Sequence, residues 1–396
     1  MNTQAPTSAA PAATPPLRGI TVLAIEHAVA APFASRQLAD LGARVIKIER
    51  PGVGDFARGY DSTVMGQSSF FVWCNRGKES LALDIKQADN LPVLHKLLAQ
   101  CDVLIQNLAP GATARMGLDF ETLHAQYPRL IVCDVSGYGE GGPYSDKKAY
   151  DLLIQAASGL ISVTGTADAP ARTGISIADI SAGMYAYSGI LAALLQRGQT
   201  GVGTRVEVTM LESLTEWMSY PLNFSHYGGQ PPQRSGLTHP TIAPYGQYRA
   251  GDGKSVIFGL QNDREWADFC NTVLQRPDLV GDARFAKNVL RVQNRAELDS
   301  VLATCFAPLS RDELLRRLDE GGIANAPLAE PDDVWAHPQL QARQRWREVQ
   351  TPHGAVQALV PPASLQGTEP VMGAVPALGE HTDAILQELG FGRSTR

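Results

Sequence analysis

Five short apolar runs, separated by segments with helical periodicity, recur along the first 137 residues of the chain. Helical patterns lie between them at 31–42, near Leu91–Gln100 and near Ala112–Gln126. Parallel strands need a long crossover connection, usually a helix, so strands that alternate with helices favour a parallel sheet. The sequence therefore predicts an α/β fold with a doubly wound, mainly parallel sheet. Its expected strands are Ile20–Glu26, Ala43–Glu49, Ser80–Lys86, Asp102–Asn107 and Leu130–Gly137.

The second half of the chain has a different pattern. Pro, Gly, His and Ser dominate from about Pro221 to Pro244, which predicts a crossover between domains. A strand pattern at Lys254–Asn262 then opens a second unit with several helices, one of which is predicted to begin with a capping box of Ser310 and Glu313. The rest is Pro-rich and ends in a short amphipathic helix. We predict a disordered tail at 1–16, a large domain at 17–222 completed by 330–396, and a small domain with linkers at 223–329.

Composition narrows the class of ligand. The 396 residues are 44% hydrophobic and carry a net charge of −6, so nucleic acid is not an expected partner and any anionic ligand needs a local basic cluster. The first residues lack the features of a secretory signal, and no apolar run is expected to reach the ~18–20 residues that span a bilayer. We therefore expect a cytoplasmic protein that does not enter a membrane. The five scattered cysteines predict buried free thiols and no metal site.

Basic residues follow several of the predicted strands. Ligands of open α/β sheets bind beyond the carboxyl ends of the strands, so these residues predict a pocket for a phosphate-bearing ligand. The first turn, "EHAVAAP", contains no glycine, which argues against a dinucleotide site of the G-x-G-x-x-G type. The basic residues of this predicted pocket are Arg50, Arg58, Arg76, Lys78, Lys86 and Arg115.

A single carboxylate, Asp179, stands among small and apolar residues in "GISIADISAGMYAYSGILAALLQR". An aspartate just before an apolar-periodic run is often the N-cap of a helix. Ser181 offers an alternative cap, which leaves Asp179 open to a chemical role. The pattern alone leaves both interpretations open.

Several long segments in a fixed order carry a resemblance to a known family. They are "PLRGITVLAIE", "LADLGARVIKIERPGVGD", "NRGKESLALDIK", "LIQNLAPGATARMGL", "VSGYGEGGPY", "YDLLIQAASGLISVTG" and "LGEHTD". The chain resembles the class III CoA-transferase, or CaiB/BaiF, family from about Leu17 to Gly390. The resemblance implies a Rossmann-like large domain and a smaller α/β domain. It also implies an interlocked homodimer, in which each ring-like subunit is threaded by the other.

The resemblance also implies site residues. It places the family's catalytic aspartate on Asp179, and Glu140 is a second candidate that either positions the incoming acid or is a solvated turn residue. A lysine that some members carry beside the loop tyrosine is Ser136 here. Tentative substrate contacts are His27, Arg58, Tyr150 and Gly259. The family's coenzyme A contacts fall on Ala28, Val29, Ala30, Arg50, Leu83, Lys86, Asn107, Leu108, Arg115, Met116 and Tyr138.

The implied activity is transfer of CoA from an acyl-CoA thioester to a free carboxylic acid, through an aspartyl anhydride and an aspartyl-CoA thioester. Coenzyme A would be a co-substrate, with no permanently bound cofactor or metal. The motifs look most like the branch that acts on C4–C5 dicarboxylates: succinate, mesaconate, itaconate, malate or citramalate. Transfer between the two carboxyls of mesaconyl-CoA is one form of this activity.

Three alternatives remain open at this stage. An acyl-CoA racemase of the same fold carries a histidine where this chain has Tyr150, and an oxalate-using transferase carries a glycine-rich loop where Phe258–Asn262 has one glycine. The third is a non-catalytic CoA-binding protein.

For the transferase, an aspartate with an ordinary pKa of ~3.9 is already ionised at neutral pH. The dipole of the following helix is expected to favour the charged form by ~0.3–1 kcal/mol.

Overall fold

The computed structural model describes residues 14–392, so residues 1–13 of the predicted tail lie outside the described part. Contacts divide the chain into two compact units, which are treated separately here. The first unit contains Met1–Gly159, Thr173–Ser219 and Gln341–Arg396 within the described range. The second contains Leu160–Arg172 and Tyr220–Leu340, so it includes residues 160–172, which the sequence prediction assigns to the large domain.

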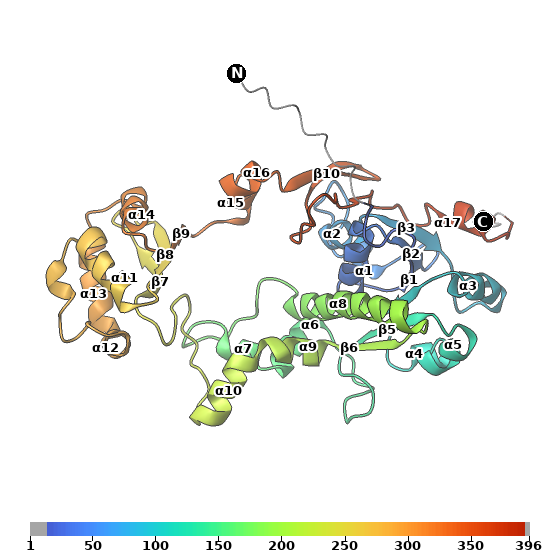
Figure 1. Cartoon of the computed structure of the whole chain (residues 1–396), viewed down its shortest axis with the longest axis horizontal. Coiled ribbons are helices and arrows are strands. Elements are labelled where there is room, and N and C mark those ends of the chain that lie inside the picture. Colours follow the sequence, from blue (N-terminus) through green and yellow to red (C-terminus); the bar gives the residue numbers. More distant parts are fainter. Residues whose placement is uncertain (1–13, 393–396) are drawn as a thin grey trace, which may run out of the picture. The chain divides into compact units, whose positions relative to one another are not determined.

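The first unit is built on a six-stranded parallel sheet in the order β3-β2-β1-β4-β5-β6 (Figure 1). The prediction of a doubly wound parallel sheet is confirmed, with two corrections. The third strand begins at Lys78, earlier than predicted. The charged Lys78 and Glu79 were predicted to lie in a loop, but the lysine is buried. The sixth strand was missed because its alternating charges gave no apolar run. The strands are β1 Thr21–Ile25, β2 Arg44–Glu49, β3 Lys78–Ala82, β4 Val103–Gln106, β5 Ile131–Ser136 and β6 Arg205–Thr209.

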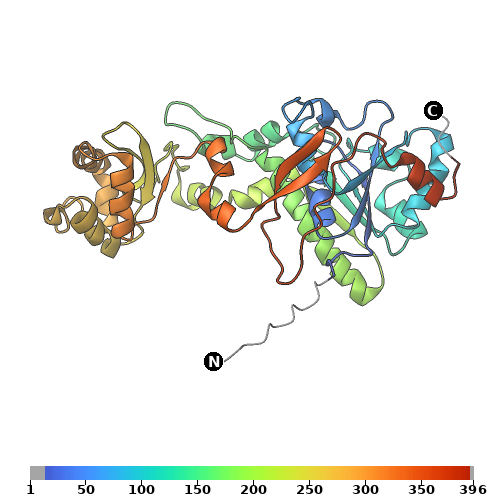
Figure 2. The same ribbon diagram turned by 90° about the horizontal axis from the view of Figure 1, so that it is seen from above.

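Helices cover both faces of this sheet. Helix α8 (Ile177–Thr200) packs against α1 (Ala30–Asp40) and against β5 and β6 on one face. On the other face, leucines of α3 (Leu91–Leu98), α5 (Phe120–Gln126) and α17 (Thr382–Glu388) share an apolar core with side chains of the sheet. Figure 2 shows α17, in red, beside the cyan helices on this side. The C-terminal helix is therefore part of the first unit, although it is last in the sequence.

Helix α8 corrects one sequence expectation. It is 24 residues long and contains an 18-residue window with a mean hydropathy of 1.3, so it is long and apolar enough to cross a membrane by length and composition alone. Ala178, Ala182, Ala186 and Ile190 are instead buried in the first unit. Arg197, near its end, pairs with Asp102 at 2.8 Å. We interpret α8 as the central core helix of the unit.

Two further predictions for the first unit need correction. The helix expected at Ala112–Gln126 is broken into α4 (Ala112–Arg115) and α5, because Gly117 takes a φ of 67° and Asp119 caps the second helix by accepting from Thr122 N at 2.9 Å. The Pro-rich end contains an antiparallel hairpin, β10 (Trp346–Thr351) and β11 (Gly354–Leu359). The remaining helices of the unit are α2 Ser69–Asn75, α6 Asp151–Ala157 and α9 Met210–Trp217, and the short turn η1 is Phe56–Gly59.

The second unit contains a three-stranded antiparallel sheet of β7 (Tyr245–Arg249), β8 (Ser255–Gly259) and β9 (Asn325–Pro327). Its core is aromatic and includes Trp266, Phe258, Phe269 and Phe306. The predicted crossover begins with a helix, α10 (Ser219–Gly228), that the sequence prediction missed. The predicted capping box is half formed: Ser310 accepts from Glu313 N, whereas the Glu313 carboxylate pairs with Arg316 and Arg317. The other helices are α7 Leu160–Val163, α11 Asp263–Asp268, α12 Asn288–Gln293, α13 Arg295–Phe306, α14 Arg311–Glu320, α15 Pro331–Trp335 and α16 Pro338–Ala342.

Candidate active site

The loop after β1 is tied to the loop after β4. The Asn107 side chain accepts a hydrogen bond from His27 N at 2.9 Å and donates one to His27 O at 2.8 Å. Because the sheet is parallel, the carboxyl ends of its strands meet at one edge, where ligands of such sheets bind. This pair of bonds therefore fixes two of the loops that the sequence assigned to coenzyme A.

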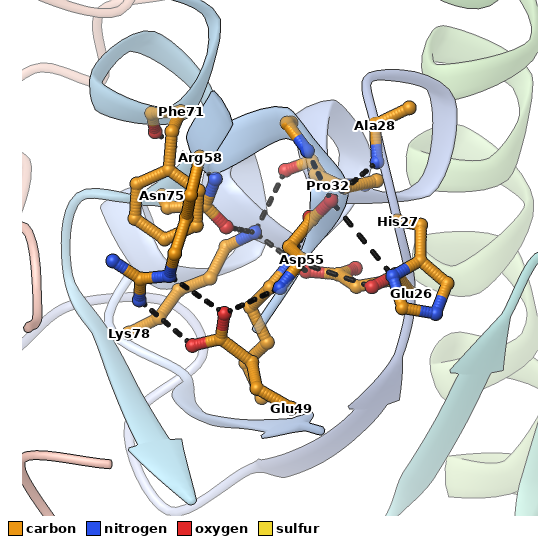
Figure 3. Close-up of polar contacts among 12 residues, drawn as sticks. Glu26, His27, Ala28, Pro32, Glu49, Asp55, Arg58, Phe71, Asn75 and Lys78 are labelled. Carbon is orange, nitrogen blue, oxygen red and sulfur yellow. Dashed lines mark hydrogen bonds and ion pairs between the residues drawn. The ribbon is translucent and has the colours of Figure 1, made fainter. Parts of the chain in front are cut away.

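A fully buried ion network lies beneath the first loop (Figure 3). Lys78 Nζ lies 2.7 Å from Glu26 Oε1, and Lys47 Nζ lies 2.8 Å from Asp55 Oδ2 and 3.4 Å from Glu26 Oε1. Burial opposes charge on Glu26, but Lys78 and Lys47 outweigh it and hold its pKa below the ordinary value. Burial lowers the pKa of Lys78 to about 8, against the attraction of Glu26. Buried charges of this kind persist because each has an opposite partner.

Asp55 connects this network to the backbone of the first loop. Its Oδ1 accepts from Ala28 N at 3.1 Å and from Ala57 N at 2.9 Å, while its Oδ2 binds Lys47. Ala28 has a φ of 62°, in the left-handed region that glycine usually occupies. The glycine-free turn therefore reaches a glycine-like conformation because a buried carboxylate holds the amide of Ala28.

Three of the basic residues assigned to a phosphate pocket belong to buried or half-buried ion pairs. Arg76 is buried against Asp40, with Nη2 2.7 Å from Oδ2, and Lys78 is buried against Glu26. The prediction that these two contact a phosphate is therefore wrong. Arg58 forms two hydrogen bonds of 2.8 Å with the Glu49 carboxylate and lies over the Phe71 ring. Its tentative role as a substrate contact stays a prediction. The Glu49 carboxylate already binds the Arg58 guanidinium in this structure.

Asp179 lies in the first turn of α8, three positions after the N-cap residue Ser176. One turn further along, Gly183 allows a close approach of the first turn of α1: a Cβ there would lie 2.7 Å from Ala30 O and 2.9 Å from the Phe33 ring. Residues four apart share one face of a helix, so Asp179 and Gly183 face the same way. The glycine therefore brings the Asp179 face of α8 against the start of α1, which directly follows the loop of Ala28 and Val29.

The carboxylate at Asp179 is not the N-cap of its helix. The Asp151 side chain takes that role from α6: its Oδ1 accepts from Ala178 N at 2.8 Å and from Asp179 N at 3.4 Å. Burial, and then the charge of Asp151, raise the pKa of Asp179 to about 7. This corrects the expectation that Asp179 has an ordinary aspartate pKa, because burial and a like charge outweigh the helix dipole.

An exposed tyrosine, Tyr60, lies near this carboxylate. Burial and the charges of Asp55 and Asp179 raise the pKa of Tyr60 to about 12, which places its phenol in the field of both carboxylates. The Tyr60 ring contacts Phe56, which stacks on His27 with 5.2 Å between ring centres. Phe56 and Tyr60 are each about half exposed, as 50% and 48% of their surfaces are accessible. Tyr60 therefore connects the surroundings of Asp179 with an exposed aromatic cluster of Tyr60, Phe56 and His27.

Comparison with known proteins identifies the family. The model of CoA-transferase family III matches residues 17–382. The chain belongs to CoA-transferase family III. The human succinyl-CoA:glutarate CoA-transferase is 33% identical over 378 residues, 94% of this chain and 86% of that protein. The succinyl-CoA:mesaconate CoA-transferase of Haloarcula hispanica is 31% identical over 96% of this chain and 98% of that protein. A CAIB/BAIF family protein from Brucella suis has the same fold, with a TM-score of 0.84 and 33% identity over 94% of this chain and 99% of that one.

The other family III positions spread along the same sheet edge. Arg50, Lys86 and Arg115 are exposed after β2, after β3 and at the end of α4. Lys147 lies over the Tyr138 ring at 5.6 Å, so a cation stands beside this tyrosine although Ser136 replaces the family lysine. These coenzyme A contacts stay predictions, as do the buried Val29, Ala30 and Leu83 and the half-buried Ala28, Asn107, Leu108, Met116 and Tyr138.

Three tentative residues have less direct support. Glu140 is exposed and pairs with Arg205, the first residue of β6, at 2.8 Å, so its carboxylate is engaged at the start of that strand. Tyr150 is exposed beside Asp151. Gly259 belongs to the second unit, where it packs against the Tyr245 ring. Sequence reasoning missed Asp55 and Asp151. The only signal for either was its place: Asp55 follows a strand in the "PGVGD" turn, and Asp151 begins a helix.

Proposed function

We propose that this chain transfers coenzyme A from succinyl-CoA to a second C4–C5 dicarboxylate, with glutarate and mesaconate as the first candidates. The observation that supports it most is Asp179: a half-buried carboxylate with a raised pKa and no cationic partner within residues 14–392. Family III relatives that act on succinyl-CoA with these acids support the choice of substrates.

The reaction proceeds by four exchanges at one carboxylate. An Asp179 oxygen attacks the thioester carbonyl of succinyl-CoA, the C–S bond breaks, and the thiolate leaves with the electron pair to give a mixed anhydride. The thiolate then attacks the Asp179 carbonyl, which forms aspartyl-CoA thioester and releases succinate. The acceptor carboxylate attacks this thioester and expels the thiolate. The thiolate finally attacks the acceptor's carbonyl, forms the new thioester and frees Asp179.

The raised pKa of Asp179 favours its acylation. In the anhydride and in the thioester the side chain has no charge, so burial and the charge of Asp151 no longer oppose it. A shift from 3.8 to about 7 corresponds to about 4 kcal/mol, at ~1.36 kcal/mol per pKa unit. This destabilises the free carboxylate relative to both covalent intermediates, and a destabilised ground state of this kind lowers the barrier to acylation.

Coenzyme A binds across the carboxyl edge of the sheet in this proposal. The exposed Arg50, Lys86 and Arg115 supply positive charge for its phosphates within an acidic protein. The first loop is held by Asp55 and leads into α1, whose Ala30 carbonyl and Phe33 ring approach the Asp179 face of α8 at Gly183. Coenzyme A serves as a co-substrate and not as a resident cofactor.

We also propose that the active form is an interlocked homodimer in the cytoplasm. Helix α10 supports the dimer, because four of its large apolar residues are exposed in the single chain. Large exposed apolar patches mark protein–protein interfaces. Light scattering of the purified protein tests the dimer, and a monomeric mass would contradict it. The four residues are Tyr220, Leu222, Phe224 and Tyr227.

A panel of acceptor acids tests the proposed function. The protein is mixed with succinyl-CoA and glutarate, mesaconate, citramalate, malate, itaconate or oxalate, and new thioesters are identified by mass. We expect glutarate or mesaconate to exceed oxalate by about tenfold or more in kcat/KM. Asp179→Asn is expected to lower kcat by about 10⁴-fold. The matched control is Asp383→Asn, which changes an aspartate in the first turn of α17 and should retain activity.

Three results would redirect or overturn this proposal. Transfer to oxalate that is faster than to any C4–C5 acid would indicate an oxalate-type transferase. Incorporation of deuterium at Cα of a 2-methylacyl-CoA in heavy water, with no acceptor acid, would indicate a racemase. Full activity of Asp179→Asn would remove the carboxylate from the mechanism altogether.

A further inference from the structure

Asp151 contacts the nucleophile's helix through the backbone. One of its carboxylate oxygens accepts from the amides of Ala178 and Asp179, the second and third residues of α8. These amides have no partner within the helix, because the first turn of any helix leaves its N–H groups free. A side chain from α6 therefore fixes the turn that carries Asp179.

The other oxygen of Asp151 is held as firmly. Gln155 Nε2 donates to Asp151 Oδ2 at 2.6 Å, and Gln155 Oε1 accepts from Thr173 N at 3.1 Å. Gln155 is fully buried, so its amide has no water to replace these partners. Three N–H donors reach the two Asp151 oxygens, and a group that accepts at both oxygens has the pattern of an ionised carboxylate.

The groups that face Asp179 are mostly acidic or neutral. From α6 the group is Asp151, and from the end of η1 it is Tyr60, which also faces Asp55 and Tyr150. Arg36 and Asp40 of α1 face Tyr187 instead, two turns further along α8. Arg197 of α8 itself is at the far end and pairs with Asp102. No ion pair to Asp179 or Asp151 is present within the described residues 14–392.

We propose that Asp151 is a positioning residue that fixes the first turn of α8 and, through its like charge, drives Asp179 from its free form to its acylated form. The inference rests on the proposed nucleophilic role of Asp179. When Asp179 attacks the thioester carbonyl, its negative charge passes to the departing thiolate. The repulsion from Asp151 therefore disappears as the C–O bond forms and the C–S bond breaks. Asp151 touches neither substrate, and it acts only through Asp179.

The test follows acylation of Asp179 as a function of pH. The pH profile of kcat/KM for succinyl-CoA reports the ionisation of the free enzyme. We expect an inflection near pH 7 in the parent and a downward shift of about one pH unit in Asp151→Asn. Intact-protein mass spectrometry should also show that, above pH 8, the ratio of CoA adduct to free enzyme is about tenfold lower in Asp151→Asn than in the parent. Asp151→Ser, whose hydroxyl can still cap a helix, should behave in the same way.

Controls separate this inference from the proposed function. Asp119→Asn removes the charge from another helix-capping aspartate, on α5, and should leave the inflection where it is. An adduct that forms normally while the inflection of both Asp151 variants stays near pH 7 would overturn the inference alone. An inflection near pH 4 in the parent would also overturn the inference, and this result does not depend on whether the variants fold. No adduct in the parent with any donor would instead overturn the proposed function.

Discussion

Two groups of carboxylates within the first unit have opposite electrostatic environments. Glu26 and Asp55, beneath the first loop, are fully buried and bound to Lys47 and Lys78. Asp179 is less buried but faces another carboxylate, and no cation pairs with it within residues 14–392. Their pKa values move apart accordingly: those of Glu26 and Asp55 are lowered and that of Asp179 is raised to about 7.

This difference in pKa distinguishes carboxylates that stabilise the fold from a carboxylate that is suited to a reaction. Opposite charges in a dry site stabilise each other's ionised form, so the network under the loop holds one fixed arrangement. Like charges do the reverse, and a carboxylate kept in that state is more basic and more reactive. The first group therefore positions the loop, and the second contains the carboxylate that we propose as the nucleophile. Tyr60 lies in the field of both Asp55 and Asp179, and the contrast between the two groups can be tested by removing one charge at a time.

The largest expected effect comes from breaking the paired group. Lys47→Met keeps the apolar part of the side chain but leaves Asp55 and Glu26 without one cation. Removing one member of a buried ion pair typically costs about 3–5 kcal/mol, so the free energy of unfolding of the first unit should fall by that amount. Urea unfolding followed by tryptophan fluorescence measures it.

Arg44→Met is the matched control for this experiment. Arg44 also pairs with two carboxylates, Glu79 and Glu388, but all three side chains are partly exposed. Ion pairs at the surface contribute about 0–1 kcal/mol, so this variant should unfold close to the parent. Equal losses for the two variants would show that burial does not distinguish the networks.

An intermediate effect is expected from neutralising the unpaired group. The pKa of Asp179 is near 7 in the folded chain and near 3.8 when unfolded, so between these values the folded state binds the extra proton. The free energy of unfolding of the parent therefore falls as pH rises through this window. Asp179→Asn does not titrate, and its stability gain over the parent should grow by about 2–4 kcal/mol from pH 4 to pH 8.

Thermal unfolding at pH 4, 6 and 8 measures this gain. Asp383→Asn serves as the control, because it removes an aspartate of a helix's first turn whose environment is not that of Asp179. A constant difference between Asp179→Asn and the parent at all three pH values would contradict the raised pKa.

The smallest effect concerns the loop itself. Ala28 pays a steric cost at φ 62° that glycine does not, but glycine loses more backbone entropy on folding. Ala28→Gly should therefore change the free energy of unfolding by about 1 kcal/mol or less. Ala28→Val, with a β-branched side chain at the same φ, should lower it clearly. A stable valine variant would show that Asp55 does not hold the loop in this conformation.

Apolar periodicity was enough to predict the parallel sheet, because five of its strands are short runs that are buried on both faces. It failed at β6, whose charged residues alternate, and at Lys78, whose burial depends on Glu26 from a distant segment. Asp179 was assigned from a family motif and its role stays a prediction, whereas Asp151 was missed because its contacts are with a helix 27 residues away in sequence. The burial of Lys78 and the contacts of Asp151 depend on groups that are distant in sequence, so local patterns did not predict them.

Trapping of the acylated side chain tests the central claim most directly. The tryptic peptide 173–197 contains Asp179 as its only acidic side chain, so a modification there is assigned without ambiguity. The protein is incubated with succinyl-CoA and then with hydroxylamine, which converts an activated carboxyl to a hydroxamate. The account predicts a hydroxamate on this peptide that requires the thioester and is absent from Asp179→Asn. An unmodified peptide from protein that is turning over its substrates would contradict it.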